Sequence, residues 1–220
     1  MLARPLDAIR RAARLRSPLA RALLVPLLST VTPLALAGGG PLGIDSRLTY
    51  DNSGIWRRTN QDILIDAMMA TVGVGALWQG GEDRLGKTFW QSVDATVVSG
   101  AATLALKEAF GRQRPYQTSD PNKWFSGGQS FPSGEVTTTS ALVTPFVLEY
   151  GREYPAVYAL ELLPVYDGIA RMKVWGHWQT DVIAGFGIGF AGGYFMRKLH
   201  TPLVFSAMPH GIQVGIKKSF

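Results

Sequence analysis

A histidine and an aspartate near the C-terminal end of the chain have a spacing that suits nucleophilic catalysis. His177 and Asp181 are four residues apart, so in a helix the carboxylate can accept a hydrogen bond from the imidazole. That bond would fix the tautomer of the ring and leave its other nitrogen free as a nucleophile. Arg171 precedes the histidine by six residues and can bring positive charge to the same ligand. An isolated pair of this kind is more often a structural hydrogen bond.

Two basic residues have the spacing of an anion receptor. Lys107 and Arg114 are seven positions apart, two turns of a helix, and Pro115 follows them. Both side chains can therefore project from one helix face. A lysine and an arginine that converge would bind a dianion, because the arginine fork matches phosphate oxygens. Without further support, such a pair more often marks a solvated helix face.

The segment 131–135, Phe-Pro-Ser-Gly-Glu, has the composition of a helix start. Ser133 precedes the expected helix, and Gly134 lets backbone N–H groups approach a ligand. The free amides and the helix dipole then favour an anion. A plain N-cap is the simpler interpretation of the segment.

Together these clusters resemble the type-2 phosphatidic acid phosphatase superfamily, which also contains bacterial acid phosphatases and vanadium haloperoxidases. The motifs of that family run Lys-x6-Arg-Pro, then Pro-Ser-Gly-His, then Ser-Arg-x5-His-x3-Asp. The chain matches their order and internal spacings over roughly residues 60–197. The matching residues are Lys107, Arg114, Pro115, Pro132, Ser133, Gly134, Arg171, His177 and Asp181.

The resemblance implies a phosphatase that hydrolyses a phosphate monoester or pyrophosphate through a phosphohistidine intermediate. His177 would attack phosphorus in line, and Asp181 would hold the ring and stabilise its charge. Several cations around the phosphoryl group supply the electrostatic stabilisation that the transfer needs, so the resemblance implies no metal and no cofactor. The implied phosphate ligands are Lys107, Arg114, Ser133, Gly134 and Arg171.

The sequence departs from the family at two positions. Ala170 replaces a serine, which removes one hydrogen bond. Glu135 replaces the histidine that protonates the leaving oxygen, and a glutamate can do so only when it is itself protonated. Neighbouring cations should lower the pKa of Glu135, whereas burial and a bound dianion should raise it. Three interpretations stay open: an acid that works at low pH, a substrate with a good leaving group, or a pseudoenzyme that binds phosphate or lipid phosphate in the cell envelope.

Aromatic residues near the motifs would suit a lipid tail, although they also fit simple packing. We therefore expect a lipid phosphate slightly ahead of a soluble ester, with possible association with a membrane surface. A vanadium-dependent haloperoxidase would share the anion site and is a further alternative. The aromatic residues are Trp124, Phe125, Trp175 and Trp178.

The charge distribution argues against nucleic acid as a partner. Residues 1–37 contain six arginines and one acid, which accounts for +5 of the formal charge of +6. The rest of the chain is therefore nearly neutral, unlike a nucleic-acid-binding domain. The chain has no cysteine, which excludes thiol chemistry and thiolate metal sites.

The same N-terminal stretch has the pattern of an export signal. A basic region precedes an apolar run over 22–36, and Ala35 and Ala37 stand ahead of three glycines. We expect residues 1–37 to be a signal peptide of an exported, periplasmic protein. The alternative is a retained anchor that places the protein on the periplasmic side of the inner membrane.

The elements that must position these residues are helical. An irregular segment is expected over 38–60, a helical domain over 61–200 and an extended tail over 201–220. The fold class is all-α, a compact bundle of about five core helices, similar to the acid phosphatase and haloperoxidase fold. The apolar runs are shorter than the ~20 residues of a membrane span, which favours a soluble or peripheral bundle and leaves an embedded form open. Helices are expected over 63–78, 89–110, 133–150, 154–169 and 181–199.

Overall fold

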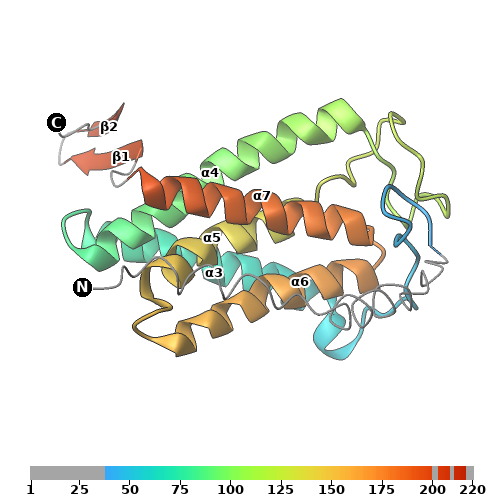
Figure 1. The fold of residues 1–220 in the computed structure, drawn as a ribbon, viewed down its shortest axis with the longest axis horizontal. Coiled ribbons are helices and arrows are strands. Elements are labelled where there is room, and N and C mark those ends of the chain that lie inside the picture. Colours follow the sequence, from blue (N-terminus) through green and yellow to red (C-terminus); the bar gives the residue numbers. More distant parts are fainter. Residues whose placement is uncertain (1–37, 200–202, 209–210, 217–220) are drawn as a thin grey trace, which may run out of the picture. The chain divides into compact units, whose positions relative to one another are not determined.

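The computed structural model describes residues 38–199, 203–208 and 211–216. These residues form five α-helices, two short 3-10 helices and a two-stranded antiparallel sheet (Figure 1). The result confirms the predicted all-α fold class and its five core helices. The predicted signal peptide or anchor over 1–37 lies outside the described residues and stays a prediction. The elements are η2 (Gly54–Trp56), α3 (Arg58–Gln79), α4 (Arg84–Phe110), α5 (Gly134–Tyr150), η3 (Pro155–Glu161), α6 (Leu162–Lys173), α7 (Gln179–Lys198), β1 (Leu203–Met208) and β2 (Gly211–Ile216).

Local sequence explains the ends of α4, the longest helix. The side chain of Asp83 caps its start by accepting a hydrogen bond of 2.6 Å from the backbone N–H of Gly86. The helix ends at Gly111, which has a φ of 50°, a left-handed conformation that glycine adopts without a steric penalty. Lys107 therefore lies in the last turn, and Arg114 lies beyond the helix, not two turns along it. The prediction that both project from one helix face was wrong.

One other predicted helix differs from the structure. The helix expected over 154–169 begins as the 3-10 helix η3 and continues as α6 to Lys173. Pro155 has no N–H, so it is accepted in the first turn. The tail, for which an extended conformation was expected, contains the antiparallel strands β1 and β2, in which Leu203 pairs with Ile216.

The centre of the bundle is formed by α4, α5 and α7, which all pack against one another. Close approach of α5 and α7 depends on glycines at four-residue spacing, which lie on one face of α7. A Cβ atom at Gly185 would lie 2.5 Å from the carbonyl oxygen of Ser133, and one at Gly189 would lie 2.4 Å from that of Thr137. Backbone of α7 therefore packs directly on backbone of α5, close to the start of α5.

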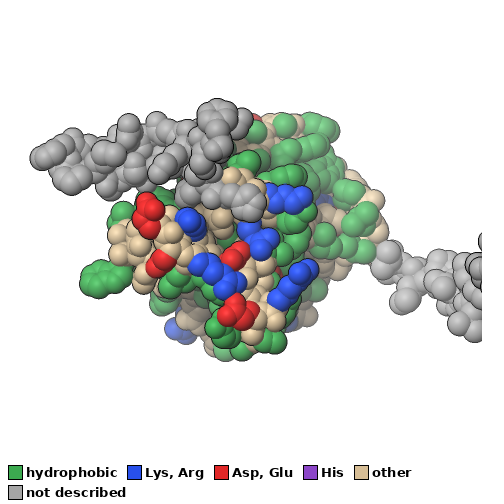
Figure 2. All heavy atoms as spheres, turned by 60° about the vertical axis from the view of Figure 1, so that its left-hand side comes forward, with side chains coloured by type: hydrophobic (Ala, Val, Ile, Leu, Met, Phe, Trp, Pro, Cys, Tyr) green, Lys and Arg blue, Asp and Glu red, His purple; other side chains and the backbone are tan. Residues whose placement is uncertain are grey.

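The end of the bundle away from the predicted site carries charges of both signs. Arg84, at the start of α4, forms ion pairs with Glu149 and Glu153, and Arg197 in α7 pairs with Glu149. Figure 2 shows Lys and Arg side chains interspersed with Asp and Glu side chains on this end. Such exposed pairs are worth little individually.

Within the part of the chain that the structure describes, none of the helices combines the length and the apolar character required to span a bilayer.

Two substitutions in α7 test the backbone packing. We expect Gly189→Ala to lower the free energy of unfolding by about 1–3 kcal/mol, because the new methyl group overlaps the Thr137 carbonyl. Gly187→Ala is the matched control, since no atom lies within 4 Å of the new group; it should stabilise the protein by about 0.5–1 kcal/mol. Urea unfolding followed by circular dichroism measures both. Equal stability of the two variants would contradict the close approach of α5 and α7.

Candidate active site

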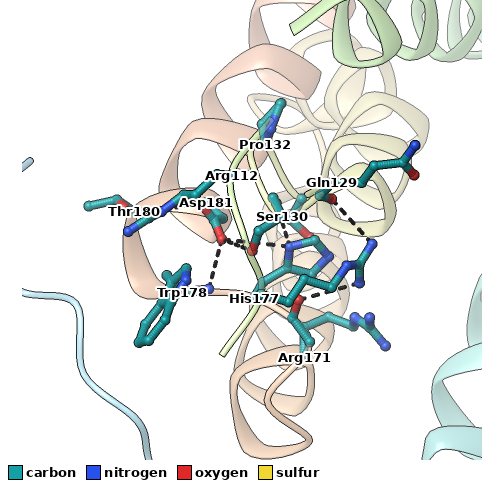
Figure 3. Close-up of polar contacts among 12 residues, drawn as sticks. Arg112, Gln129, Ser130, Pro132, Arg171, His177, Trp178, Thr180 and Asp181 are labelled. Carbon is teal, nitrogen blue, oxygen red and sulfur yellow. Dashed lines mark hydrogen bonds and ion pairs between the residues drawn. The ribbon is translucent and has the colours of Figure 1, made fainter. Parts of the chain in front are cut away.

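The two cations of the first motif meet at one backbone carbonyl. Lys107 donates hydrogen bonds of 2.7 Å to the carbonyl oxygens of Gln129 and Pro132. Arg114, which lies beyond the end of α4, donates a hydrogen bond of 3.2 Å to the same Gln129 oxygen (Figure 3). The sequence prediction that these two side chains converge is therefore confirmed, with a loop carbonyl as their meeting point.

Lys107 keeps a donor for a ligand. An ammonium group has three N–H donors, and the two carbonyls use two of them. Burial lowers the pKa of Lys107 to about 8, and the charge of Arg114 acts in the same direction. At neutral pH the side chain is therefore mostly charged, and an arriving anion would stabilise that charge.

His177 is held by the same loop. Its Nδ1 lies 2.7 Å from the carbonyl oxygen of Ser130, an oxygen that can only accept, so Nδ1 carries the proton. In the neutral ring Nε2 then has a free lone pair, and it has no hydrogen-bond partner among the described residues. Burial lowers the pKa of His177 to about 4, and the charges of Arg171 and Arg114 add to this despite the opposing influence of Asp181. The ring is therefore neutral at neutral pH, as a nucleophile must be.

The relation between His177 and Asp181 differs from the prediction. The histidine lies before α7, whose N-cap is Trp178, so the pair does not share a helix. Nδ1 is 3.8 Å from Asp181 Oδ2, too far for a hydrogen bond, because the Ser130 carbonyl takes the N–H. The carboxylate instead faces the ring as a charge partner and accepts a hydrogen bond of 2.5 Å from the Ser130 hydroxyl. Figure 3 shows the ring with Ser130, Asp181 and Arg171 around it.

A buried arginine that the sequence did not single out organises this part of the site. Arg112 lies 2.6 Å from both Asp181 Oδ1 and Asp45 Oδ2, and all three side chains are 0% exposed. Burial alone would raise the pKa of Asp181, but the His177 ring, the charge of Arg112 and the Ser130 hydroxyl hold it below its usual value. Asp181 is therefore an anion that connects Arg112 to the loop residue whose carbonyl orients His177.

Residues 45–48, in the irregular segment before α3, bind the buried network and the loops beside it. Asp45 accepts hydrogen bonds from both the backbone N–H and the hydroxyl of Thr180. Arg47 donates two hydrogen bonds to the Pro115 carbonyl, and the indole N–H of Trp175 donates to the Leu48 carbonyl. The segment thus fixes the loops that carry Arg114 and His177.

Ser133 and Gly134 lie where the prediction placed them, at the start of α5. The Ser133 hydroxyl is buried and has no hydrogen-bond partner in the described part of the chain, and it forms no N-cap bond. A Cβ atom on Gly134 would lie 3.7 Å from Lys107 Cε, so the helix start is adjacent to the lysine. An unsatisfied buried hydroxyl beside a cation suits an anionic ligand better than a plain cap.

Glu135 is bound by two arginines. Arg58, at the start of α3, donates hydrogen bonds of 2.6 and 2.8 Å to its two oxygens, and Arg171 Nε lies 3.4 Å from Oε2. Burial alone would raise the pKa of Glu135, but the hydrogen bonds from Arg58 and the charge of Arg171 outweigh it, so the pKa is lowered. Glu135 is therefore ionised at neutral pH. Arg58 was not anticipated, because nothing in its local sequence marks it.

The predicted site residues thus come together around the loop 129–132 and the start of α5. Arg114 also donates to the Gly176 carbonyl at 3.3 Å, next to His177, and Arg171 joins the cluster through Glu135. This cluster has three cations, a neutral imidazole and an unsatisfied hydroxyl, a combination that can bind a tetrahedral anion and attack it.

Comparison with known proteins places these residues in a family context. A family model described as the PAP2 superfamily matches residues 89–204, a range that contains all the predicted site residues. A lipid A 1-phosphatase from Rhizobium etli is 36% identical over 117 residues, which cover 50% of this chain and 47% of that protein. One from Porphyromonas gingivalis is 30% identical over 136 residues, which cover 61% of this chain and 28% of the relative. These matches span less than half the length of either relative. The crystal structure of Aquifex aeolicus LpxE matches with a TM-score of 0.44 and 18% identity, covering 69% of this chain and 99% of that chain.

Removal of Arg112 tests the buried network. We expect Arg112→Met to lower the free energy of unfolding by about 3–5 kcal/mol, because it leaves two buried carboxylates without a counter-charge. Arg197→Met, at a partly exposed ion pair, is the matched control and should cost less than about 1 kcal/mol. Denaturant unfolding of both variants checks this. A loss of stability in Arg112→Met that is as small as the loss expected for Arg197→Met would show that Arg112 is dispensable.

Proposed function

Because the chain belongs to the PAP2 superfamily, we propose that it is a phosphatase that hydrolyses a lipid phosphate. The observation that carries this proposal is the convergence of Lys107, Arg114 and His177 on the carbonyls of residues 129–132. Cations that share a meeting point beside a neutral imidazole provide both binding of the phosphoryl group and a nucleophile.

The chemistry proposed here begins with attack of His177 Nε2 on phosphorus. The new P–N bond forms as the bond to the leaving oxygen breaks, and the leaving group takes the electron pair. The ring becomes a phosphoimidazolium whose Nδ1–H stays on the Ser130 carbonyl and whose positive charge faces the Asp181 carboxylate at 3.8 Å. Water then attacks phosphorus, the P–N bond breaks, and inorganic phosphate leaves with the neutral ring restored.

The cations stabilise the charge on the phosphoryl oxygens during both steps. Lys107 has its third N–H donor available, and Arg114 and Arg171 each have guanidinium donors that the carbonyls and Glu135 do not use. Because such transfers depend on positioning and electrostatics, these residues can supply the stabilisation themselves.

A lipid phosphate is supported by the surface as well as by the relatives. Large apolar side chains are exposed on α3, α4 and α7, where a lipid tail or a membrane surface could be accommodated. The similarity to lipid A 1-phosphatases points to the same substrate class. Examples of these exposed side chains are Leu77, Trp78, Val97, Leu104, Ile183 and Phe195.

One observation favours a second function, a binding protein that does not catalyse. Glu135 is ionised and lies 3.4 Å from Arg171, so a carboxylate occupies part of the cationic site that a phosphate would need. A pseudoenzyme would bind phosphate or vanadate and release no product.

Trapping of the intermediate separates these functions. On mixing the full chain with a ³²P-labelled lipid phosphate in detergent micelles and quenching in alkali, we expect label on His177, located by mass spectrometry. His177→Asn should lose the label and at least about 1,000-fold in turnover. His210→Asn, which changes a histidine outside the three sequence motifs, is the matched control and should keep both. Vanadate binding with neither turnover nor label would support the pseudoenzyme and refute the phosphatase.

The charge of Lys107 predicts the alkaline side of the pH profile. Its pKa is lowered to about 8, so the ammonium is present below this pH and is lost above it, and the phosphoryl group then loses a ligand. We expect kcat/KM to fall as the pH rises above about 8. Lys107→Arg should move this fall to higher pH, because a guanidinium stays charged. Lys87→Arg, exposed on the same helix, should leave the profile unchanged. A profile that is the same for all three proteins would exclude Lys107 as the titrating ligand.

A further inference from the structure

The described residues offer no evident proton donor for the leaving group. Asp181 is ionised by its partners and His177 serves as the nucleophile. Lys107 uses two of its donors on carbonyls, and its third is the one assigned above to the phosphoryl oxygens. Burial raises the pKa of Asp167 to about 7, so this carboxyl is partly protonated at neutral pH, but neither of its oxygens forms a hydrogen bond to a described residue of the site. Glu135 remains as the acidic group nearest to the cations.

Three separate effects keep Glu135 ionised. Arg58 binds both carboxylate oxygens in a fork, the geometry in which an arginine–carboxylate pair is strongest. Arg171 adds a second positive charge at 3.4 Å. Glu135 also lies in the first turn of α5, where the helix dipole favours a negative charge.

The pair is partly shielded from water. The Arg58 side chain is 39% exposed and that of Glu135 is 25% exposed, so solvent screens the interaction less than it would at an open surface. Arg58 also pairs with Asp62 at 2.6 Å, which fixes its guanidinium on α3. The charged and titratable groups that interact with Glu135 are Arg58, Lys107, Asp167, Arg171 and His177.

We propose that Arg58 is a positioning residue that holds Glu135 as an anion and thereby makes the site selective for leaving groups that depart without a proton. The preferred substrate is then a lipid diphosphate, and an alkyl phosphate monoester is hydrolysed more slowly. This inference rests on the proposed phosphatase function. In the diphosphate the bridging P–O bond breaks as the His177 P–N bond forms, and the leaving phosphate takes the electron pair. Any proton it gains comes from solvent after departure.

The chemistry of the two leaving groups differs greatly. A leaving phosphate has a second pKa of about 6, so it is stable as an anion at neutral pH. A leaving alkoxide is a strong base and must be protonated as it departs. Water is a poor proton donor for this step, because its own pKa is about 16. With Glu135 ionised, the described part of the site has no carboxylic acid beside the cations to supply that proton, and general-acid catalysis of this kind is worth about 100-fold or more.

The experiment compares two substrates with the same alkyl tail, one a monophosphate and one a diphosphate, with 4-nitrophenyl phosphate as an activated reference. We expect kcat/KM of the full chain to be at least about 100-fold higher for the diphosphate than for the monophosphate. Equal rates for both would overturn this inference and leave the phosphatase function standing. No turnover of any of the three would overturn the phosphatase function itself.

Variants identify the cause of the preference. Glu135→His introduces a donor and should raise turnover of the alkyl monophosphate by about 100-fold, with little gain for the diphosphate. Arg58→Met should reduce the ratio of diphosphate to monophosphate turnover by about 10-fold, because Glu135 without its two hydrogen bonds from Arg58 is protonated more readily. Arg57→Met, at the exposed neighbouring position, should keep the wild-type ratio. A ratio that Arg58→Met does not change, or that Arg57→Met changes equally, would overturn the role of Arg58.

Discussion

The Arg112 guanidinium, shared between Asp45 and Asp181, is the interaction on which the rest of the site depends. Removing a charge from water is costly unless every donor finds a partner, and Arg112 also donates to the carbonyl of Pro121 at 2.6 Å. The ring of Trp124 lies 4.4 Å from the guanidinium carbon. The loop after α4 therefore folds around one cation. Because the loop is fixed in this way, its carbonyls at residues 129–132 can hold Lys107, Arg114 and His177.

Packing of the helices brings the second half of the site to the first. The glycine face of α7 lets α5 approach until their backbones touch, and this contact is at the start of α5. There the Ser133 N–H donates a hydrogen bond of 3.0 Å to the Asp181 carbonyl. The residue that anchors Arg112 through its side chain thus anchors the start of α5 through its backbone. A change in helix packing would therefore alter the distance between the phosphate ligands and the nucleophile.

The positive side chains of the site can attract an anion, and other groups of the site offset their mutual repulsion. Positive side chains that crowd together repel one another, and here neutral carbonyls and the Glu135 carboxylate offset that repulsion. The loop carbonyls hold Lys107 and Arg114 in place, whereas Glu135 is held by Arg58 from another helix. The site therefore combines a preformed cationic part with an anion whose position depends on α3.

The sequence by itself determined the helical fold class and the family, because the motif residues and their spacings are local patterns that survive without coordinates. It also located the helix start at Ser133 and the convergence of Lys107 and Arg114, although it placed Arg114 in a helix that ends at Gly111. Only the tertiary structure decided the partners of the buried and half-buried charges. Arg112 and Asp45 are 67 residues apart, and Arg58 and Glu135 are 77 apart, so no local pattern links them. An ion pair between distant residues depends on how the helices and loops pack. The same packing places the Ser130 carbonyl, and not Asp181, within hydrogen-bond distance of the His177 N–H.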